Sequence, residues 1–168
     1  MAQYKRQSDT PQETPEFEER VVCINRCSKV VKGGRNFHFS ALVVVGDRKG
    51  RVGVGFGKAN EVADAIRKGG ELARKAVVPI AMRGATLTHA VSLRSGAARI
   101  IIRPASEGTG IIAGGGMRAV LELGGVKDVL AKSMGSKNPV NVVKTTMRAL
   151  AMLRTKEQVL AKRDLAAL

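Results

Sequence analysis

A segment in which glycine alternates with apolar residues places the tightest constraint on the fold of this chain. In Gly53-Val54-Gly55-Phe56-Gly57 the period of two is typical of a β-strand, because successive side chains of a strand point to opposite faces. One face of this strand would carry only glycine, and glycine inside a strand indicates that another backbone lies close to it. Some other element must therefore pack directly against this strand.

Two further β-rich segments precede this strand, and a helix is expected after it. The three expected strands cover residues 19–31, 37–45 and 51–57. Short glycine-bearing turns at residues 32–35 and 46–50 join them, which indicates an antiparallel meander. Asn60 is a suitable N-cap for a helix that runs to about Ala76, with apolar residues at helical spacing. The first unit is therefore predicted to be a three-stranded antiparallel sheet plus a helix.

The second half of the chain also mixes strands and helices. We expect strands at residues 86–93 and 98–103, a helix at 111–123, a strand at 128–132, and a helix that Asn138 caps, with Pro139 at its first position. The fold class is therefore α+β with two domains. The expected segments are a disordered, acidic leader at 1–18, an N-terminal domain at 19–80, a C-terminal domain at 81–154 and a tail at 155–168.

The charge of the chain favours a polyanionic partner. It holds 29 basic and 14 acidic residues, which give a formal net charge of +15 at pH 7. Residues 21–80 contain twelve basic and four acidic residues, and residues 81–168 contain fourteen and five, so both domains are basic. Such an excess repels itself unless an anionic partner neutralises it. Nucleic acid is the commonest such partner; an anionic membrane is the alternative, but no amphipathic helix with large apolar anchors is evident.

Residues that stack on bases or bind metals are scarce. The chain has no Trp, one Tyr and four Phe, which argues against binding single strands by stacking. Cys23 and Cys27, with the distant His38 and His89, do not supply the roughly four closely spaced ligands of a zinc site. The two cysteines lie too far apart along a strand for a disulfide, so we expect two reduced, half-buried thiols. No metal or cofactor is predicted.

The sequence offers neither a membrane segment nor a catalytic group. No apolar run approaches the roughly 20 residues of a membrane span, and the first 19 residues lack the apolar centre of a secretory signal. A soluble intracellular protein is therefore expected. Neither His38 nor His89 has a neighbouring Ser or Asp in the context of a catalytic triad, so we do not expect an enzyme.

The segment from Asn25 to Arg35 (NRCSKVVKGGR) carries the clearest sign of function. It holds four cations in eleven residues, and its Gly-Gly tip lets a phosphate backbone approach closely. An ordinary hairpin turn explains the glycines but not the density of cations, so we interpret the loop as an RNA contact. The turn at residues 47–51 also combines cations with glycine and is a weaker candidate for an RNA contact. An ordinary solvated hairpin tip explains it equally well. Further basic candidates are Lys58, before the expected helix, and the helical stripe Arg67, Lys68, Arg74 and Lys75.

Two glycine-rich segments imitate nucleotide-binding motifs. Residues 53–59 lack the spacing of a Walker loop, and Ala59 stands where that motif needs Ser or Thr. Residues 108–113 fit G-x-G-x-x-A, with Asp128 at the distance of the acidic residue in a dinucleotide fingerprint. The strands before it look antiparallel, and too little chain follows for the remaining strands. We therefore interpret these glycines as sites of close packing with a strand or a neighbouring protein, and keep a nucleotide-dependent oxidoreductase as a rival.

Several collinear motifs together resemble bacterial small-subunit ribosomal protein five, from about residue 19 to residue 163. They are NRxSKxVKGGR within residues 21–39, VVVGD at 43–47, residues 50–59, PASEGTGIIAGG at 104–115, and NPxNVV at 138–143. The resemblance implies an N-terminal fold similar to double-stranded-RNA-binding domains and a βαβ-type C-terminal domain with two helices. The leader and the end of the tail depart from the family pattern.

The resemblance also implies a function and partners. Members of this family are non-enzymatic constituents of the small ribosomal subunit in the cytoplasm, where they bind ribosomal RNA and link body and head. They contact small-subunit ribosomal proteins four and eight, lie near the messenger RNA entry path, influence translational accuracy, and reach the neck RNA beside the spectinomycin site. The RNA-binding candidates are Arg26, Ser28, Lys29, Lys32, Gly33, Gly34, Arg35, Arg48, Lys49, Arg51, Lys58, Arg67 and Lys68. The protein-interface candidates are Gly108, Gly110 and Arg118.

Overall fold

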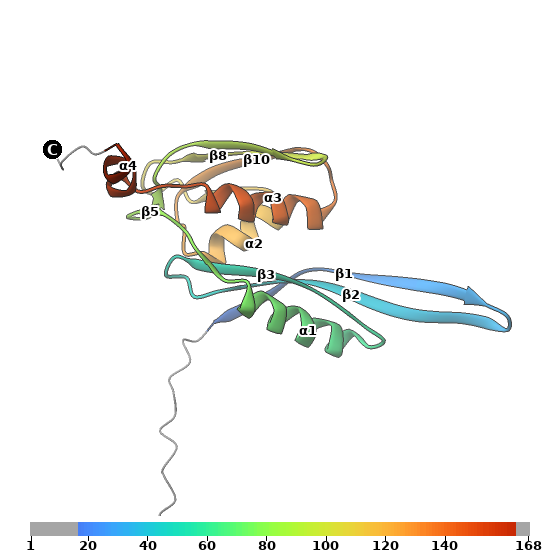
Figure 1. The fold of residues 1–168 in the computed structure, drawn as a ribbon. Helices are drawn as coiled ribbons and strands as arrows, with labels where there is room; N and C mark the ends of the chain where they lie inside the picture. Colours follow the sequence, from blue (N-terminus) through green and yellow to red (C-terminus); the bar gives the residue numbers. More distant parts are fainter. Residues whose placement is uncertain (1–16, 164–168) are drawn as a thin grey trace, which may run out of the picture.

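The first sheet of the protein is antiparallel, and its strands lie in chain order (Figure 1). The computed structural model describes residues 17–163, so most of the expected leader and the end of the expected tail lie outside the described residues. The strands are β1 (Glu18–Val31), β2 (Gly34–Gly46), β3 (Arg51–Ala59) and β4 (Val78–Pro79). The expected meander is confirmed, with the two-residue β4 added at its edge. Glu18, the last residue of the expected leader, already belongs to β1.

β1 and β2 extend beyond the rest of this sheet. β3 remains paired with β2 only as far as Phe39 and Ala59, whereas β1 and β2 stay paired to Val31 and Gly34. From the pair of Arg26 and Phe39 onward, β1 and β2 therefore form a two-stranded hairpin, residues 26–39, that projects from the molecule (Figure 1). We call it the projecting hairpin.

Helix α1 (Val62–Lys75) lies on the face of the sheet that carries the alternating glycines. A Cβ atom at Gly53, Gly55 or Gly57 would overlap a backbone carbonyl of α1. The close backbone approach expected from the glycine alternation is therefore confirmed. Asn60 as the N-cap is wrong, because Glu61 occupies that position with an extended backbone and no side-chain cap bond.

The second sheet has the order β7-β8-β10-β9, with β9 parallel to β10 and the other pairs antiparallel. Its strands are β7 (Val91–Ser95), β8 (Ala98–Pro104), β9 (Ile111–Ile112) and β10 (Val129–Gly135). Helices α2 (Gly115–Leu123) and α3 (Pro139–Ala151) cover one face (Figure 1). A small hairpin of β5 (Met82–Arg83) and β6 (Thr86–Leu87) precedes this sheet, and α4 (Lys156–Lys162) follows it. The expected α+β architecture is confirmed.

Some elements of the second unit differ from the expectation. The helix expected at residues 111–123 is wrong at its start, because Ile111 and Ile112 form β9 and pair in parallel with β10. Gly114, with an extended backbone, is the N-cap, and the helix begins only at Gly115. The strand expected at 128–132 begins at Val129 and continues to Gly135. The cap of α3 is as expected, with Asn138 Oδ1 accepting a hydrogen bond of 3.0 Å from the Val140 N–H.

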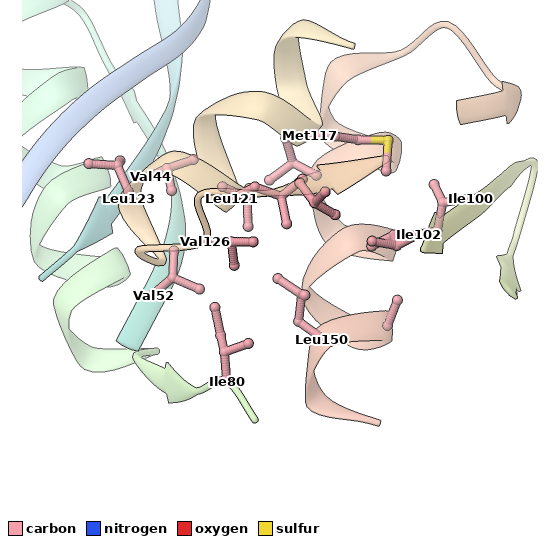
Figure 2. Close-up of a cluster of buried hydrophobic side chains, with 14 of the residues drawn as sticks. Val44, Val52, Ile80, Ile100, Ile102, Met117, Leu121, Leu123, Val126 and Leu150 are labelled. Atoms are coloured by element: carbon pink, nitrogen blue, oxygen red, sulfur yellow. The ribbon is translucent and has the colours of Figure 1, made fainter. Parts of the chain in front are cut away.

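One aliphatic core joins the two units (Figure 2). The face of the first sheet that points away from α1 contributes buried side chains, as do α2, α3 and the connection between the units. They include Leu42, Val44, Val52, Ile80, Leu121, Leu123, Val126 and Leu150. The turn between β2 and β3 is fixed to the end of α2, where the Arg48 N–H donates to the Leu123 carbonyl at 2.9 Å. The first sheet is therefore enclosed between α1 and the second unit.

Candidate nucleic-acid interface

The tip of the projecting hairpin is narrow and carries uncompensated cations. Gly33 has a φ of +93°, in the left-handed region that favours glycine, and makes the turn possible. Lys29, Lys32 and Arg35 are exposed. Within residues 17–163 no carboxylate forms an ion pair with any of these three cations. Their charge is therefore available to an anionic partner.

The strand register assigns the side chains of the projecting hairpin to two faces. Arg26 and Phe37 share one face, with the guanidinium carbon 4.7 Å from the centroid of the ring. This cation–π contact orients Arg26 across the hairpin. The other face has Lys29 directly opposite Asn36 and Cys27 directly opposite His38. Both faces thus present polar or cationic groups, and Ser28 lies exposed beside Phe37.

A cavity of about 490 Å³ lies where the hairpin meets the start of α1. Two of the sequence candidates, Lys58 and Lys68, line it from β3 and α1. Polar groups from three elements complete it; the others that line it include Cys27, His38, Ser40, Asn60 and Asp64. Lys58 is held over the Phe56 ring, with its Nζ 5.6 Å from the centroid. The cavity combines two ammonium groups with hydroxyl, amide and imidazole groups that can bind a phosphate, while the Asp64 carboxylate that also lines it is paired with Arg67.

The cations of the second turn lie at the opposite end of β2 from the hairpin tip. Thirteen positions separate Arg35 from Arg48, which corresponds to roughly 40 Å of strand. Arg48 pairs with Glu18 at 2.7 Å, and Arg51 pairs with Asp47 at 2.6 Å. The structure therefore does not bring this turn together with the projecting hairpin, and two of its three cations are partly neutralised inside the chain.

The basic stripe of α1 is also divided. Arg67 donates to Asp64 at 3.0 Å, and Arg74 pairs with Glu19 at 2.6 Å. Only Lys68 of the expected stripe lines the cavity at the base of the hairpin. Burial of the adjacent face of α1 against the glycines of β3 leaves these cations on the outside of the helix.

The protein-interface candidates cluster around β9. Gly108 and Gly110 have φ values of +86° and +73°, and nothing lies close to the position of a Cβ at either residue. Backbone conformation, not the expected close packing, therefore requires glycine here. The Gly110 N–H donates to the buried Asp128 carboxylate at 2.8 Å, and Arg118 donates to the Ile111 carbonyl at 3.4 Å. The structure thus brings Gly110 and Arg118 together, and uses Asp128 to hold the loop in place.

The cysteines and histidines do not form a metal site in the described residues. Cys23 and Cys27 are free; Cys27 is exposed, and burial raises the pKa of the Cys23 thiol despite a hydrogen bond from the backbone of Leu42. Residues 17–163 contain no group of three or more His, Cys, Asp or Glu side chains that could bind an ion. No described helix is long and apolar enough to cross a membrane.

Sequence reasoning missed several of the groups that line cavities. His38, Ser40 and Asn60 line the cavity at the base of the hairpin. The sequence gives no sign of their role, because it depends on the strand register, which places His38 opposite Cys27. A second cavity, of about 700 Å³, lies between α4 and the β5–β6 hairpin. Arg83 and Arg154 line it, and no sequence motif pointed to it.

Comparisons with known proteins agree over both halves of the chain. The family model described as ribosomal protein S5, N-terminal domain, matches residues 17–81, and that of the ribosomal protein S5 C-terminal domain matches residues 93–163. The small ribosomal subunit protein uS5 of Protochlamydia amoebophila is 55% identical over 145 residues, which are 86% of this chain and 87% of that protein. The proteins of the same name from Chlamydia trachomatis and Campylobacter jejuni are 52% and 57% identical, over 88% and 83% of this chain and 90% and 95% of their own lengths.

Proposed function

This chain belongs to the ribosomal protein S5 family, and from that premise we propose that its projecting hairpin is the principal contact with ribosomal RNA. As a member of this family the chain is a non-enzymatic constituent of the small ribosomal subunit, located in the cytoplasmic ribosome, and it binds ribosomal RNA. The proposal concerns which of its residues do so.

The unpaired cations at the hairpin tip carry the proposal. Lys29, Lys32 and Arg35 extend away from the folded body, and no carboxylate of the described residues is paired with them. Phosphate contacts by such groups release counterions and supply much of the affinity for RNA. Gly33 and Gly34 carry no side chains and have open space around them, so that an RNA backbone can approach their peptide groups.

The base of the hairpin supplies the second part of the contact. Lys58 and Lys68 meet at the cavity there, and a phosphate in it would be held by both. Lys29 lies on the face of the hairpin that leads to this cavity, whereas Arg26 and Ser28 lie on the opposite face, so RNA could contact both faces. Arg48, Lys49 and Arg51 would belong to a separate contact, to which the exposed Lys49 contributes the charge that is not shared with a carboxylate. Arg67 would contact RNA only after its hydrogen bond to the Asp64 carboxylate breaks.

We further propose the position and partners that the family resemblance implies. The hairpin would reach neck RNA beside the spectinomycin site, while the second domain contacts the body, so that the chain links body and head. The loop around Gly110 and Arg118 would contact small-subunit ribosomal protein four and thereby influence translational accuracy. Protein eight and messenger RNA near its entry path would be further neighbours. The hairpin belongs to the first sheet and this loop borders the second sheet, and their place on different units supports a linking role.

Binding of small-subunit ribosomal RNA at several KCl concentrations tests the hairpin contact. The variant Lys29→Gln, Lys32→Gln, Arg35→Gln should bind more weakly, and its plot of log affinity against log salt should be flatter. The slope should change by about 0.9 for each phosphate that the variant no longer neutralises. The variant Lys127→Gln, Lys156→Gln, Lys162→Gln removes the same charge elsewhere and should change the slope less. Equal slopes for the two variants would contradict the proposal.

A further inference from the structure

One face of the second sheet is left uncovered by the described residues. The inner face packs on α2 and α3, and Ile100, Ile102 and Val129 are buried there. Because side chains alternate along a strand, the residues between these point to the opposite, outer face. No described helix lies over that outer face (Figure 1).

Cations dominate the part of the outer face over β7 and β8. Arg94, Arg99 and Arg103 are exposed there, and Lys132 lies beside them on β10. From Arg99 to Arg103 the strip is about 13 Å long, at the usual rise of a strand. The strip is defined by these four residues, and none of them was a candidate from the sequence.

The charges of this strip are not neutralised within the described part of the chain. Arg94 stands directly opposite Arg99 on the neighbouring strand. Like charges in that position destabilise a sheet. None of the four cations forms an ion pair with a carboxylate among residues 17–163. An anionic partner would remove this repulsion.

Two observations favour RNA phosphates over an acidic protein surface. Three of the four cations are arginines, whose planar guanidinium groups bind phosphate through two parallel hydrogen bonds. The strip contains no aromatic ring, so it suits the backbone of a helical segment better than unstacked bases.

We infer that the outer face of β7 and β8 is a second RNA-binding surface, which holds the phosphate backbone of a helical RNA segment. The inference rests on the proposed function, since it assigns a further contact to a ribosomal RNA-binding protein. It adds a site on the second domain that does not depend on the projecting hairpin.

Directed hydroxyl-radical probing of assembled small subunits tests this inference. In the full chain with Cys23→Ser and Cys27→Ser, an iron–EDTA group is attached at Ser92→Cys, an exposed position opposite Ile101 on the outer face. We expect cleavage of ribosomal RNA in both strands of a helical segment near this position. A second chain, tethered at Asn36→Cys on the projecting hairpin, reports the first RNA contact in the same way.

The outcomes separate the inference from the proposed function. If RNA is cleaved from the tether at position 36 but not from the tether at position 92, the inference is overturned and the hairpin contact is retained. The outer face is then covered by protein or by solvent. Absence of RNA cleavage from both positions overturns the hairpin contact as well.

Binding of a short RNA duplex to a chain with native cysteines gives a second measurement. The variant Arg94→Gln, Arg99→Gln, Arg103→Gln should flatten the salt dependence by about two to three units of slope, at roughly 0.9 units for each phosphate. The variant Lys127→Gln, Lys156→Gln, Lys162→Gln is the matched control. If the slope changes no more for the arginine variant than for the control variant, the inference is overturned.

Discussion

The carboxylate of Asp47 fixes the turn between β2 and β3 by accepting three hydrogen bonds. Its Oδ1 accepts from the N–H groups of Lys49 and Arg51, at 2.8 and 3.0 Å, and its Oδ2 accepts from Arg51 Nε at 2.6 Å. Burial acts to raise the pKa of Asp47, but the hydrogen bonds from Arg51 and Lys49 outweigh it and hold the pKa below its ordinary value. This turn also contacts the end of α2, through the hydrogen bond from the Arg48 N–H to the Leu123 carbonyl. The Asp47 carboxylate therefore stabilises the contact between the two units.

The lowered pKa of Asp47 predicts a stability contribution that depends on pH. A carboxyl whose pKa falls on folding stabilises the folded chain above its unfolded pKa, near 3.8, and loses that contribution as the pH falls through its folded value. Asp47→Asn should therefore lower the free energy of unfolding by about 1–3 kcal/mol at pH 7. The deficit should shrink below pH 3.8, when measured by urea unfolding across a pH series.

A matched substitution separates this effect from loss of surface charge. Asp64→Asn removes a half-exposed carboxylate that pairs with Arg67, and should change the free energy of unfolding by less than about 0.5 kcal/mol. Equal losses for Asp47→Asn and Asp64→Asn at pH 7 would count against the role given to Asp47.

At the scale of elements, the contact between β3 and α1 depends on the absence of side chains. A Cβ at Gly55 would overlap the Gly69 carbonyl of the helix, and Gly69 in turn packs against Val43 of β2. The two backbones are therefore closer than any other residue type would permit. This packing places the first half of α1, which includes Lys68, beside the base of the projecting hairpin.

Gly55→Ala should destabilise the protein, because helix and strand must separate to make room for a methyl group. We expect a loss of about 1–3 kcal/mol in the free energy of unfolding, measured by chemical denaturation. Gly34→Ala is the control, since nothing lies near its Cβ position and its backbone is not in the left-handed region. That variant should stay within about 0.5 kcal/mol of the parent chain. A Gly55→Ala chain as stable as Gly34→Ala would show that the helix can move at little cost.

The elements that the sequence predicts well are those with strong local signals. The glycine alternation predicted that another backbone lies close to β3, and Asn138 with Pro139 predicted the start of α3. β9 was missed because two residues are too few for a periodic pattern, and its parallel pairing with Val129 is a long-range contact. The hairpin cations were identifiable from their density, but the meeting of Lys58 with His38, and the separation of Arg48 from the tip, follow from register and sheet topology.

At the scale of the whole molecule, two sheet-and-helix units share one core. Val44 and Val52 from the first unit are as deeply buried as Leu121 from the second, and all three belong to the same cluster (Figure 2). An ion pair between Arg20 and Glu122 and the hydrogen bond from Gly50 to Gly124 also cross between the units. The projecting hairpin and the outer sheet face are thus held at fixed positions on one packed body.

A shared core predicts that the two units unfold together. Leu121→Ala removes a fully buried side chain between them and should lower the free energy of unfolding by about 2–5 kcal/mol. Hydrogen exchange should then show the same loss of protection for amides in β2 and in α3, with a single calorimetric transition. Leu72→Ala is the matched control, because Leu72 is 50% exposed on α1 and its removal should cost less than about 0.5 kcal/mol. Loss of protection confined to α2 and α3, with β2 unchanged, would mean that the units unfold separately despite their common core.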